Sequence, residues 1–283
     1  EMSASLVGSE MCIRDSIDKE RQNADLLMAR MIQRLLKETK GQLVSFNGGT
    51  KDNAIPRECE ASLIYESDEE AAKAEELACE LAETYAEELT PAEPDFSCEI
   101  SCETNRTAEA IPQDAAKEFI CAMRLAPNGI QKRNIKMDGF VVVSLNLGVV
   151  RTEEDRIVMI FSPRSSVASL QEDTKERLNT LAETFGFTVS HSSEYPGWSF
   201  KEDSPVREIC KESYKELFGE DLKIEAIHAG LECGLFSDAI KGLDAIAIGP
   251  TIANCHTPDE YLTLDSFERF YEFLKDILSR LAK

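Results

Sequence analysis

Three histidines, His191, His228 and His256, are the only imidazoles in the chain. His256 stands in a polar segment, residues 254–260, that follows an expected buried strand, and open α/β sheets bind their ligands at that edge. Neutral imidazole is a common zinc ligand, and neighbouring acidic residues could orient the ring. A solvated or helix-capping histidine is the alternative, so spacing alone leaves the role of His256 open.

A second segment with chemical potential runs from His228 to Gly234, between an expected strand and an expected helix. Its glycines allow the backbone to come close to a ligand, and the amides of a helix N-terminus favour a carboxylate. Glu232 is therefore either a helix cap or a partner for a substrate ammonium group. Cys233 with His228 could form a nucleophile, but no third orienting residue is indicated, and a buried structural thiol is the commoner role.

Two polar residues earlier in the chain are also singled out by their positions. Asn53 lies in a loop between two expected strands, where its residue type indicates ordinary turn chemistry. Arg164 follows a strand-like run, and its planar guanidinium could pair with a substrate carboxylate through two hydrogen bonds. A surface ion pair in so acidic a chain is the alternative for Arg164.

The composition limits the classes of function. The 283 residues include 31 Lys and Arg against 53 Asp and Glu, and the net charge of −22 argues against nucleic acid as a partner. The longest apolar runs, such as 141–143, are far too short to cross a bilayer, so no membrane partner is expected. Nine cysteines without CxxC pairs fit a reduced cytosol, so we expect a cytoplasmic protein.

Residues 1–16 differ from the remainder of the chain. The run SLVGSEMCIRDS from Ser5 to Ser16 has no helical or strand period and resembles translated sequencing-adapter read-through. A disordered N-terminal tail is the alternative. We therefore expect this segment to take no part in the fold, and the natural protein to continue upstream of Ile17.

The stretch from Ile17 to about His191 is predicted to be a duplicated α-β-β-α-β unit, a two-layer α/β sandwich. The order of expected elements in the first copy is a helix at 24–35, strands at 43–46 and 61–65, a helix that Ser67 caps, and a strand at 96–102. The order in the second copy is a helix at 115–123, strands at 140–147 and 157–162, a helix at 170–185 and a strand at 187–190. Two short motifs recur as well: SFNGG at 45–49 matches SLNLG at 144–148, and IPR at 55–57 echoes SPR at 162–164.

The stretch from about Ser192 to Lys283 alternates helix and strand more simply. Ser204 and Pro205 begin a helix that Gly219 ends. Two buried parallel strands are expected at 222–227 and 245–248, followed by an amphipathic helix at 267–281. Because two strands cannot form a stable sheet by themselves, this portion requires partner strands from elsewhere.

Several motifs, spread from Ile17 to the C-terminus, resemble those of the bacterial aminoacyl-histidine dipeptidase family. The segments that carry the resemblance are FNGGT at 46–50, NAIPRE at 53–58, SLNLGVV at 144–150, YPGW at 195–198, IHAGLECGLF at 227–236, IGPTI at 248–252 and HTPDE at 256–260. This resemblance implies a two-domain metallopeptidase in which a lid interrupts an α/β catalytic domain. Residues 17–191 would form the lid, and residues 192–283 the C-terminal portion of the catalytic domain.

The family resemblance also implies a cofactor and a reaction. Two divalent metal ions, with zinc expected and manganese or cobalt as alternatives, activate a water that attacks the peptide carbonyl, while a glutamate acts as general base. Of the metal ligands, only the last histidine falls in this chain, at His256. The other ligands and the base are expected upstream of Ile17, so the chain by itself should be inactive.

The resemblance assigns substrate and partner roles to the remaining candidates. Asn53 and Arg164 fall at lid positions that hold the carbonyl or carboxylate of a dipeptide substrate, such as Xaa-His, and Glu232 and His228 fall in a loop that lines the pocket. The family is usually dimeric, so a homodimer through the lid is expected. The alternative function, from a different class, is a non-enzymatic peptide-binding or oligomerisation module derived from the same fold.

Overall fold

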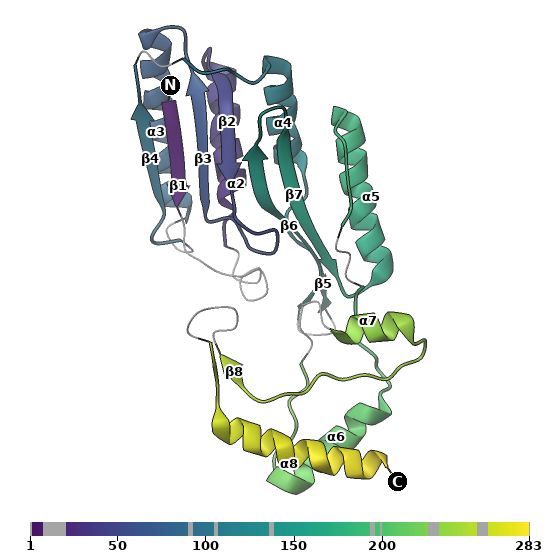
Figure 1. The fold of residues 1–283 in the computed structure, drawn as a ribbon. Helices are drawn as coiled ribbons and strands as arrows, with labels where there is room; N and C mark the ends of the chain where they lie inside the picture. Colours follow the sequence, from purple (N-terminus) through teal and green to yellow (C-terminus); the bar gives the residue numbers. More distant parts are fainter. Residues whose placement is uncertain are drawn as a thin grey trace. The chain divides into compact units, whose positions relative to one another are not determined.

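The structure, a computed structural model, describes residues 2–7, 21–89, 93–104, 107–135, 139–192, 196–198, 200–225, 232–253 and 260–282. The chain divides into two compact units, residues 1–193 and 194–283 (Figure 1). None of the helices within these described ranges is long and apolar enough to cross a membrane.

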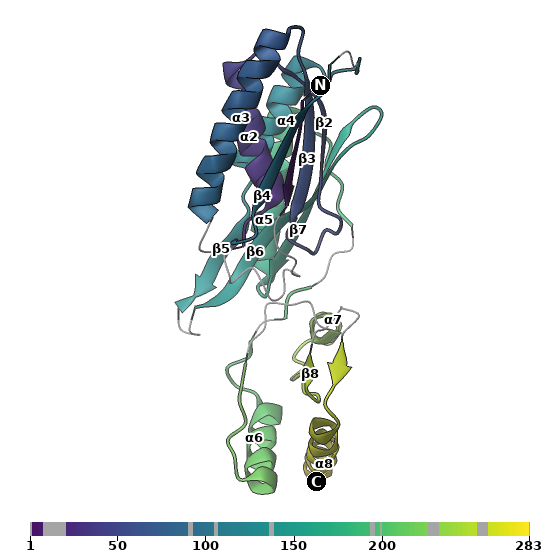
Figure 2. The ribbon, with the colours of Figure 1, turned by 90° about the vertical axis from the view of Figure 1, so that its left-hand side faces the viewer.

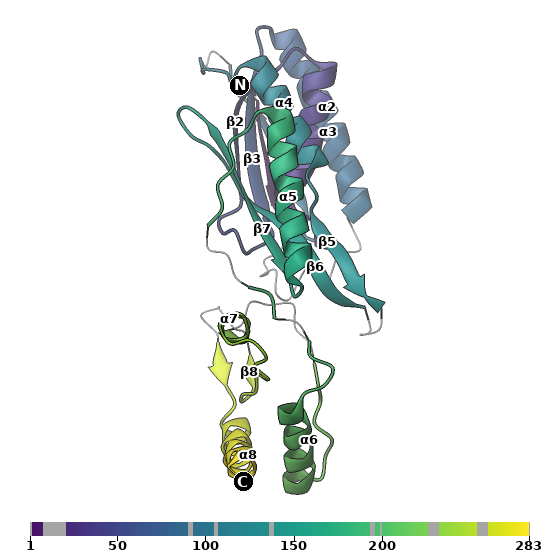
Figure 3. The ribbon, with the colours of Figure 1, turned by 90° about the vertical axis from the view of Figure 1, so that its right-hand side faces the viewer.

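Unit 1 contains β1 (Met2–Val7), α2 (Ala24–Glu38), β2 (Gln42–Gly48), β3 (Glu58–Ile64), α3 (Asp68–Leu89), β4 (Ser97–Cys102), α4 (Gln113–Leu125), β5 (Gly129–Asn134), β6 (Phe140–Thr152), β7 (Ile157–Ser165) and α5 (Ala168–Phe185). Its strands form one antiparallel sheet in the order β4-β1-β3-β2-β6-β5, and β7 pairs with the other edge of β6. The helices lie on one face of this sheet, as Figures 2 and 3 show from opposite sides. The expected α/β fold class and the two layers of this unit are thereby confirmed.

The core of unit 1 lies between the sheet and its helices. Asn23 caps the start of helix α2, because its side-chain oxygen accepts hydrogen bonds from the amides of Asp25 and Leu26. The apolar stripe of the helix includes the fully buried Met28 and Ile32. That stripe packs in one cluster with sheet residues such as Phe46 and Leu63. The period-3.6 pattern of the helix and the period-2 pattern of the strands therefore meet at one interface.

The expectation that residues 1–16 take no part in the fold is wrong for Met2–Val7. These residues form β1, which pairs antiparallel with β3 on one side and β4 on the other. Met2 and Ala4 are fully buried, and Ser3 between them points to the other face. Side chains thus alternate between the two faces of the sheet from Met2 to Ala4, before the run at Ser5 that shows no period. The strand itself is held by backbone hydrogen bonds, which any residue except proline can donate.

The second half of unit 1 departs from the expected duplication. Its order is α4-β5-β6-β7-α5, because residues 187–190 form no strand and the polar run Gly129–Asn134 forms β5 instead. Gly186 ends α5 in the left-handed conformation at φ 69°, and the residues after it, 187–190, pair with none of the described strands. The IPR and SPR motifs are not equivalent either, since residues 55–57 precede β3 whereas residues 162–164 lie near the end of β7.

Unit 2 contains α6 (Pro205–Phe218), α7 (Glu232–Ala239), β8 (Ile252–Ala253), β9 (Tyr261–Leu262) and α8 (Leu264–Leu281). Helix α6 has the expected ends: Ser204 accepts a hydrogen bond of 3.2 Å from the Arg207 amide, and Gly219 has a φ of 72°. The strands expected at 222–227 and 245–248 are wrong for the described residues, which form no sheet there. The apolar sequence favours strands, but the described strands of this unit, β8 and β9, are two residues long and pair with each other.

Candidate functional site

The turn that carries Asn53 lies between β2 and β3. Gly49 opens the loop with a φ of 67°, and the Ala54 amide closes a turn by donating to the Lys51 carbonyl at 3.2 Å. The Pro56 carbonyl accepts a hydrogen bond of 2.8 Å from the Ala24 amide, which ties the end of the loop to the start of α2. The Asn53 side chain is exposed at the tip of this anchored turn.

Strand β6 holds the turn through Asn146. This side chain is only 2% exposed, and its Nδ2 donates to the carbonyls of Asp52 at 3.3 Å and Ala54 at 2.8 Å. Gly148 allows the close contact, because a Cβ atom there would lie 2.4 Å from the Asp52 carbonyl oxygen. The turn around Asn53 is therefore fixed against the surface of the sheet.

The register of β6 and β7 brings Arg164 to the same face as this turn. Ser162 lies opposite Asn146, and Arg164 lies opposite Ser144, two residues along the strand from Asn146. Side chains directly opposite each other in an antiparallel pair share a face. The pair next to Asn146 and Ser162 along the strands, Leu147 and Phe161, points to the opposite face and packs with the helices, so Arg164 and the Asn53 turn both lie on the face without helices.

The candidates of unit 2 are described only in part. Glu232 is exposed and begins helix α7, as a cap or a pocket residue would. The Cys233 Sγ donates to the Ile246 carbonyl at 3.9 Å, a contact that fits a structural thiol. His228 and His256 lie outside the described residues.

His191, which was not assigned a site role, has an ordinary structural contact. Its Nε2 lies 3.0 Å from the Asn179 Oδ1 in unit 1. This interaction explains the residue without a ligand.

A metal centre is not formed by the described residues. Within the described ranges, no group of three or more His, Cys, Asp or Glu side chains lies close enough together to hold a metal ion. The described side chains thus do not supply the metal donors that the family resemblance implies, and His256, the one ligand that it assigns to this chain, lies outside them.

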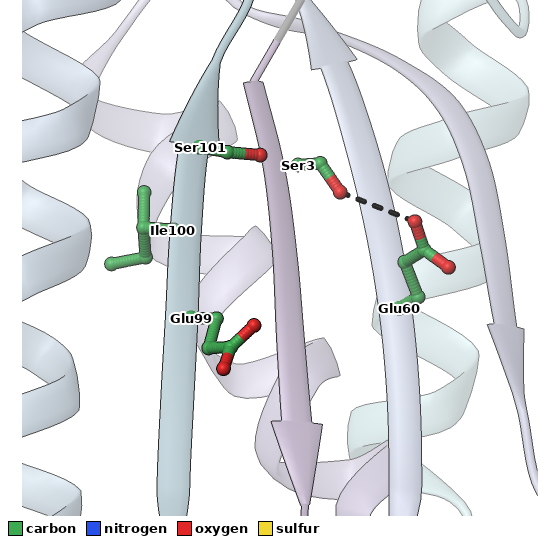
Figure 4. A pocket seen from close by; sticks show the side chains of 5 residues that line it. All are labelled: Ser3, Glu60, Glu99, Ile100 and Ser101. Atoms are coloured by element: carbon green, nitrogen blue, oxygen red, sulfur yellow. Dashed lines mark hydrogen bonds between the residues drawn. The ribbon is translucent and has the colours of Figure 1, made fainter.

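A shallow hollow of about 550 Å³ lies elsewhere on unit 1, over β1, β3 and β4 (Figure 4). Its polar lining includes Glu60 and Glu99, and the Ser3 hydroxyl donates to a Glu60 carboxylate oxygen at 3.2 Å. None of the residues predicted from the sequence to bind substrate or metal lies in it.

One residue of the site was missed by the sequence analysis. Asn146 was noted only as part of a repeated motif, although it is the amide residue in the middle of the largely apolar run VVVSLNLGVV at 141–150. A buried amide in a strand must find hydrogen-bond partners. That requirement is the signal that could have predicted its contact with a loop.

The chain is similar to peptidases by sequence and by structure. The model of peptidase family M20/M25/M40 matches residues 49–280. Cytosol non-specific dipeptidase of Escherichia coli (strain K12) is 32% identical over 263 residues, which are 92% of this chain and 53% of that protein. The crystal structure of aminoacylhistidine dipeptidase from Vibrio alginolyticus superposes with a TM-score of 0.85 at 31% identity and covers 99% of this chain and 57% of that one. The chain thus spans about half the length of these relatives.

Proposed function

Because the chain belongs to peptidase family M20/M25/M40, we propose that it supplies the substrate-binding part of an enzyme that hydrolyses dipeptides with the help of two divalent metal ions, zinc first among them. The names of the two relatives support a dipeptide as substrate, and the name of the Escherichia coli relative supports the cytoplasm as location. The two relatives contain about as much chain again, so we propose that catalysis requires the part that these 283 residues do not match.

The observation that carries the proposal is the shared face of Asn53 and Arg164 in unit 1. A dipeptide has a terminal carboxylate, a terminal ammonium and one peptide carbonyl. The guanidinium of Arg164 suits the carboxylate, because a planar fork of donors pairs with two oxygens at once. The amide of Asn53, presented on a fixed turn, can donate a hydrogen bond to the carbonyl oxygen of the bound dipeptide and so hold the substrate in place.

The candidates of unit 2 are assigned from the family resemblance. We assign Glu232 and His228 to the pocket wall and His256 to the metal. We assign to unit 1 the formation of a homodimer, which sedimentation of the purified chain would detect as twice the mass of one chain.

A chimera tests this function. The matching part of the Escherichia coli dipeptidase is replaced by the whole 283-residue chain, so that strand β1 is kept, and hydrolysis of Ala-His is measured with added zinc. We expect turnover that a chelator abolishes and that His256→Ala lowers by roughly 10³-fold or more, because loss of a metal ligand disrupts the centre.

A matched control uses a histidine without a site role. His191→Ala should keep the activity of the parent chimera, since His191 contacts only Asn179 among the interactions described for it. If the folded chimera binds zinc but leaves Ala-His intact, the peptidase function is wrong. The peptide-binding module would then be tested by titrating Ala-His into the same chimera.

A further inference from the structure

We propose that Asn146 is a positioning residue for the substrate: its side-chain amide clamps the turn that presents Asn53. This inference rests on the proposed function, in which Asn53 binds the peptide carbonyl. The Asn146 Nδ2 donates to the carbonyls of Asp52 and Ala54, the residues on either side of Asn53, at 3.3 and 2.8 Å. One buried nitrogen therefore spans the tip of the turn, and the backbone of Asn53 cannot rotate without breaking at least one of the two bonds.

The clamp has a rigid base, because the neighbouring backbone of β6 is itself held by side chains. Strand β5 pairs with β6 as far as Leu145, and β2 pairs with it again at Val150, which leaves a gap on that edge. Within the gap, the Leu147 amide donates to the Asn128 Oδ1 at 2.9 Å, and the Asn23 Nδ2 donates to the Leu147 carbonyl at 2.8 Å. The side chains thus replace the missing ladder bonds, and the strand beneath the turn keeps its geometry.

The chain offers a comparison for Asn146 in its own repeated motif. Asn47 stands at the same place in SFNGG as Asn146 does in SLNLG. Its Oδ1 accepts a hydrogen bond of 3.0 Å from the Thr152 amide, a contact between two strands that lies away from the turn. Asn47 is also exposed, whereas Asn146 is buried. The same residue type in the same motif therefore joins strands in one copy and holds a loop in the other.

Two substitutions separate the donor of Asn146 from its volume. Asn146→Ala removes both bonds to the turn. Asn146→Asp keeps the shape, but a carboxyl group donates at most one hydrogen bond when protonated and none when ionised, so it cannot hold both carbonyl oxygens. If Asn146 only fills space, Asn146→Asp should leave substrate binding unchanged. If it holds the turn by donating two hydrogen bonds, Asn146→Asp should weaken substrate binding. We expect either variant to raise KM by roughly fivefold or more, since each hydrogen bond to the turn contributes modestly by itself.

The experiment measures kcat and KM for Ala-His with the chimera described above, for Asn146→Ala, Asn146→Asp, Asn53→Ala and the control Asn47→Ala. The expected result is a raised KM for the first three with a smaller change in kcat, and values near the parent for Asn47→Ala. Unchanged KM for both Asn146 variants beside a raised KM for Asn53→Ala would overturn the inference and leave the proposed function intact.

A second measurement needs no activity. Hydrogen exchange of residues 50–54 is followed in the 283-residue chain itself. The clamp predicts faster exchange in Asn146→Ala than in the parent and in Asn47→Ala. Equal exchange in all three would overturn the inference even if the chimera proved inactive.

Discussion

The two units differ in how completely they bury their apolar residues. In unit 1 the sheet and its helices share one core, which includes the fully buried Phe46, Leu63 and Tyr85. In the described part of unit 2 the buried cluster consists of Cys210, Phe273 and Ile277. Large apolar side chains there remain exposed, such as Leu264 at 74% and Phe236 at 57%. Unit 1 thus buries its apolar residues in one core, whereas the described part of unit 2 leaves large apolar side chains exposed, and its sheet consists of the two short strands β8 and β9.

The comparison teaches that a strand depends more on its neighbours than on its own sequence. Met2–Val7 lies in a segment that looked foreign to the fold, yet it forms a strand because β3 and β4 flank it. Residues 245–248 have a strong strand sequence, yet they form no strand, and they pair with none of the described strands. Backbone pairing decides both cases.

The largest expected effect is on hydrogen exchange. In the 283-residue chain, amides of β2 and β3 should exchange on the order of 10³-fold or more slowly than those of residues 222–225 and 245–248, because only the former donate to neighbouring strands. In the chimera with the Escherichia coli dipeptidase, the two segments of unit 2 should become protected. If residues 222–225 and 245–248 exchanged slowly in the 283-residue chain itself, they would already be paired, and the contrast drawn between the two units would be wrong.

The next effect is on the stability of the two cores. Phe46→Ala should lower the free energy of unfolding of unit 1 by about 3 to 5 kcal/mol, since it removes a fully buried ring that packs edge-to-face on Phe119 with a centroid distance of 5.4 Å. Circular dichroism in urea would show the shift. The emission of Trp198, which belongs to unit 2, should keep its midpoint, and a common shift of both signals would mean that the units unfold as one.

The smallest expected effect is a pH dependence of the free energy of unfolding of unit 1. Asp25 is fully buried in α2, and burial raises the pKa of its carboxyl from 3.8 to about 7, against a smaller lowering by the neighbouring Cys59 thiol. The folded protein therefore keeps this proton up to about pH 7, whereas the unfolded chain releases it near pH 4. The contribution of the neutral carboxyl is complete below pH 4 and is lost as the pH rises to about 7.

Asp25→Asn checks this assignment, because an amide cannot ionise. Between pH 4.5 and 7.5 the parent should lose about 3 kcal/mol of unfolding free energy more than the variant does. The measurement is urea unfolding of both proteins at several pH values. Parallel pH profiles would show that Asp25 is charged, or equally solvated, in both states.

The features that the sequence predicted well are local. Ser204 caps α6, and Gly186 and Gly219 end α5 and α6 in the left-handed conformation. Each of these helix ends depends on only a few neighbouring residues, so the sequence could predict it. The long helices followed from their apolar stripes in the same way. Strand β5 and the absence of a strand at 187–190 depend on which segments meet in the sheet, and no local pattern specifies that.

In the candidate site, too, the sequence predicted the residues but not the contacts between distant segments. Asn53 and Arg164 were identified from the sequence, but their common face follows from the register of β6 with β7 and from the contact of Asn146 with the turn. For Asn146, the sequence signal is its residue type: a polar amide inside an apolar run, which needs hydrogen-bond partners. Its partners are more than 90 residues away along the chain, so the sequence could predict that it needs partners but not which they are.

The central claim is that this chain binds substrate but catalyses only when joined to the remainder of a family enzyme. The most direct test measures Ala-His hydrolysis, with added zinc, by the purified 283-residue chain and by the chimera side by side, against a blank of zinc alone. The account predicts a rate equal to the blank for the chain and chelator-sensitive turnover for the chimera. Turnover by the chain itself, above the zinc blank, would contradict it.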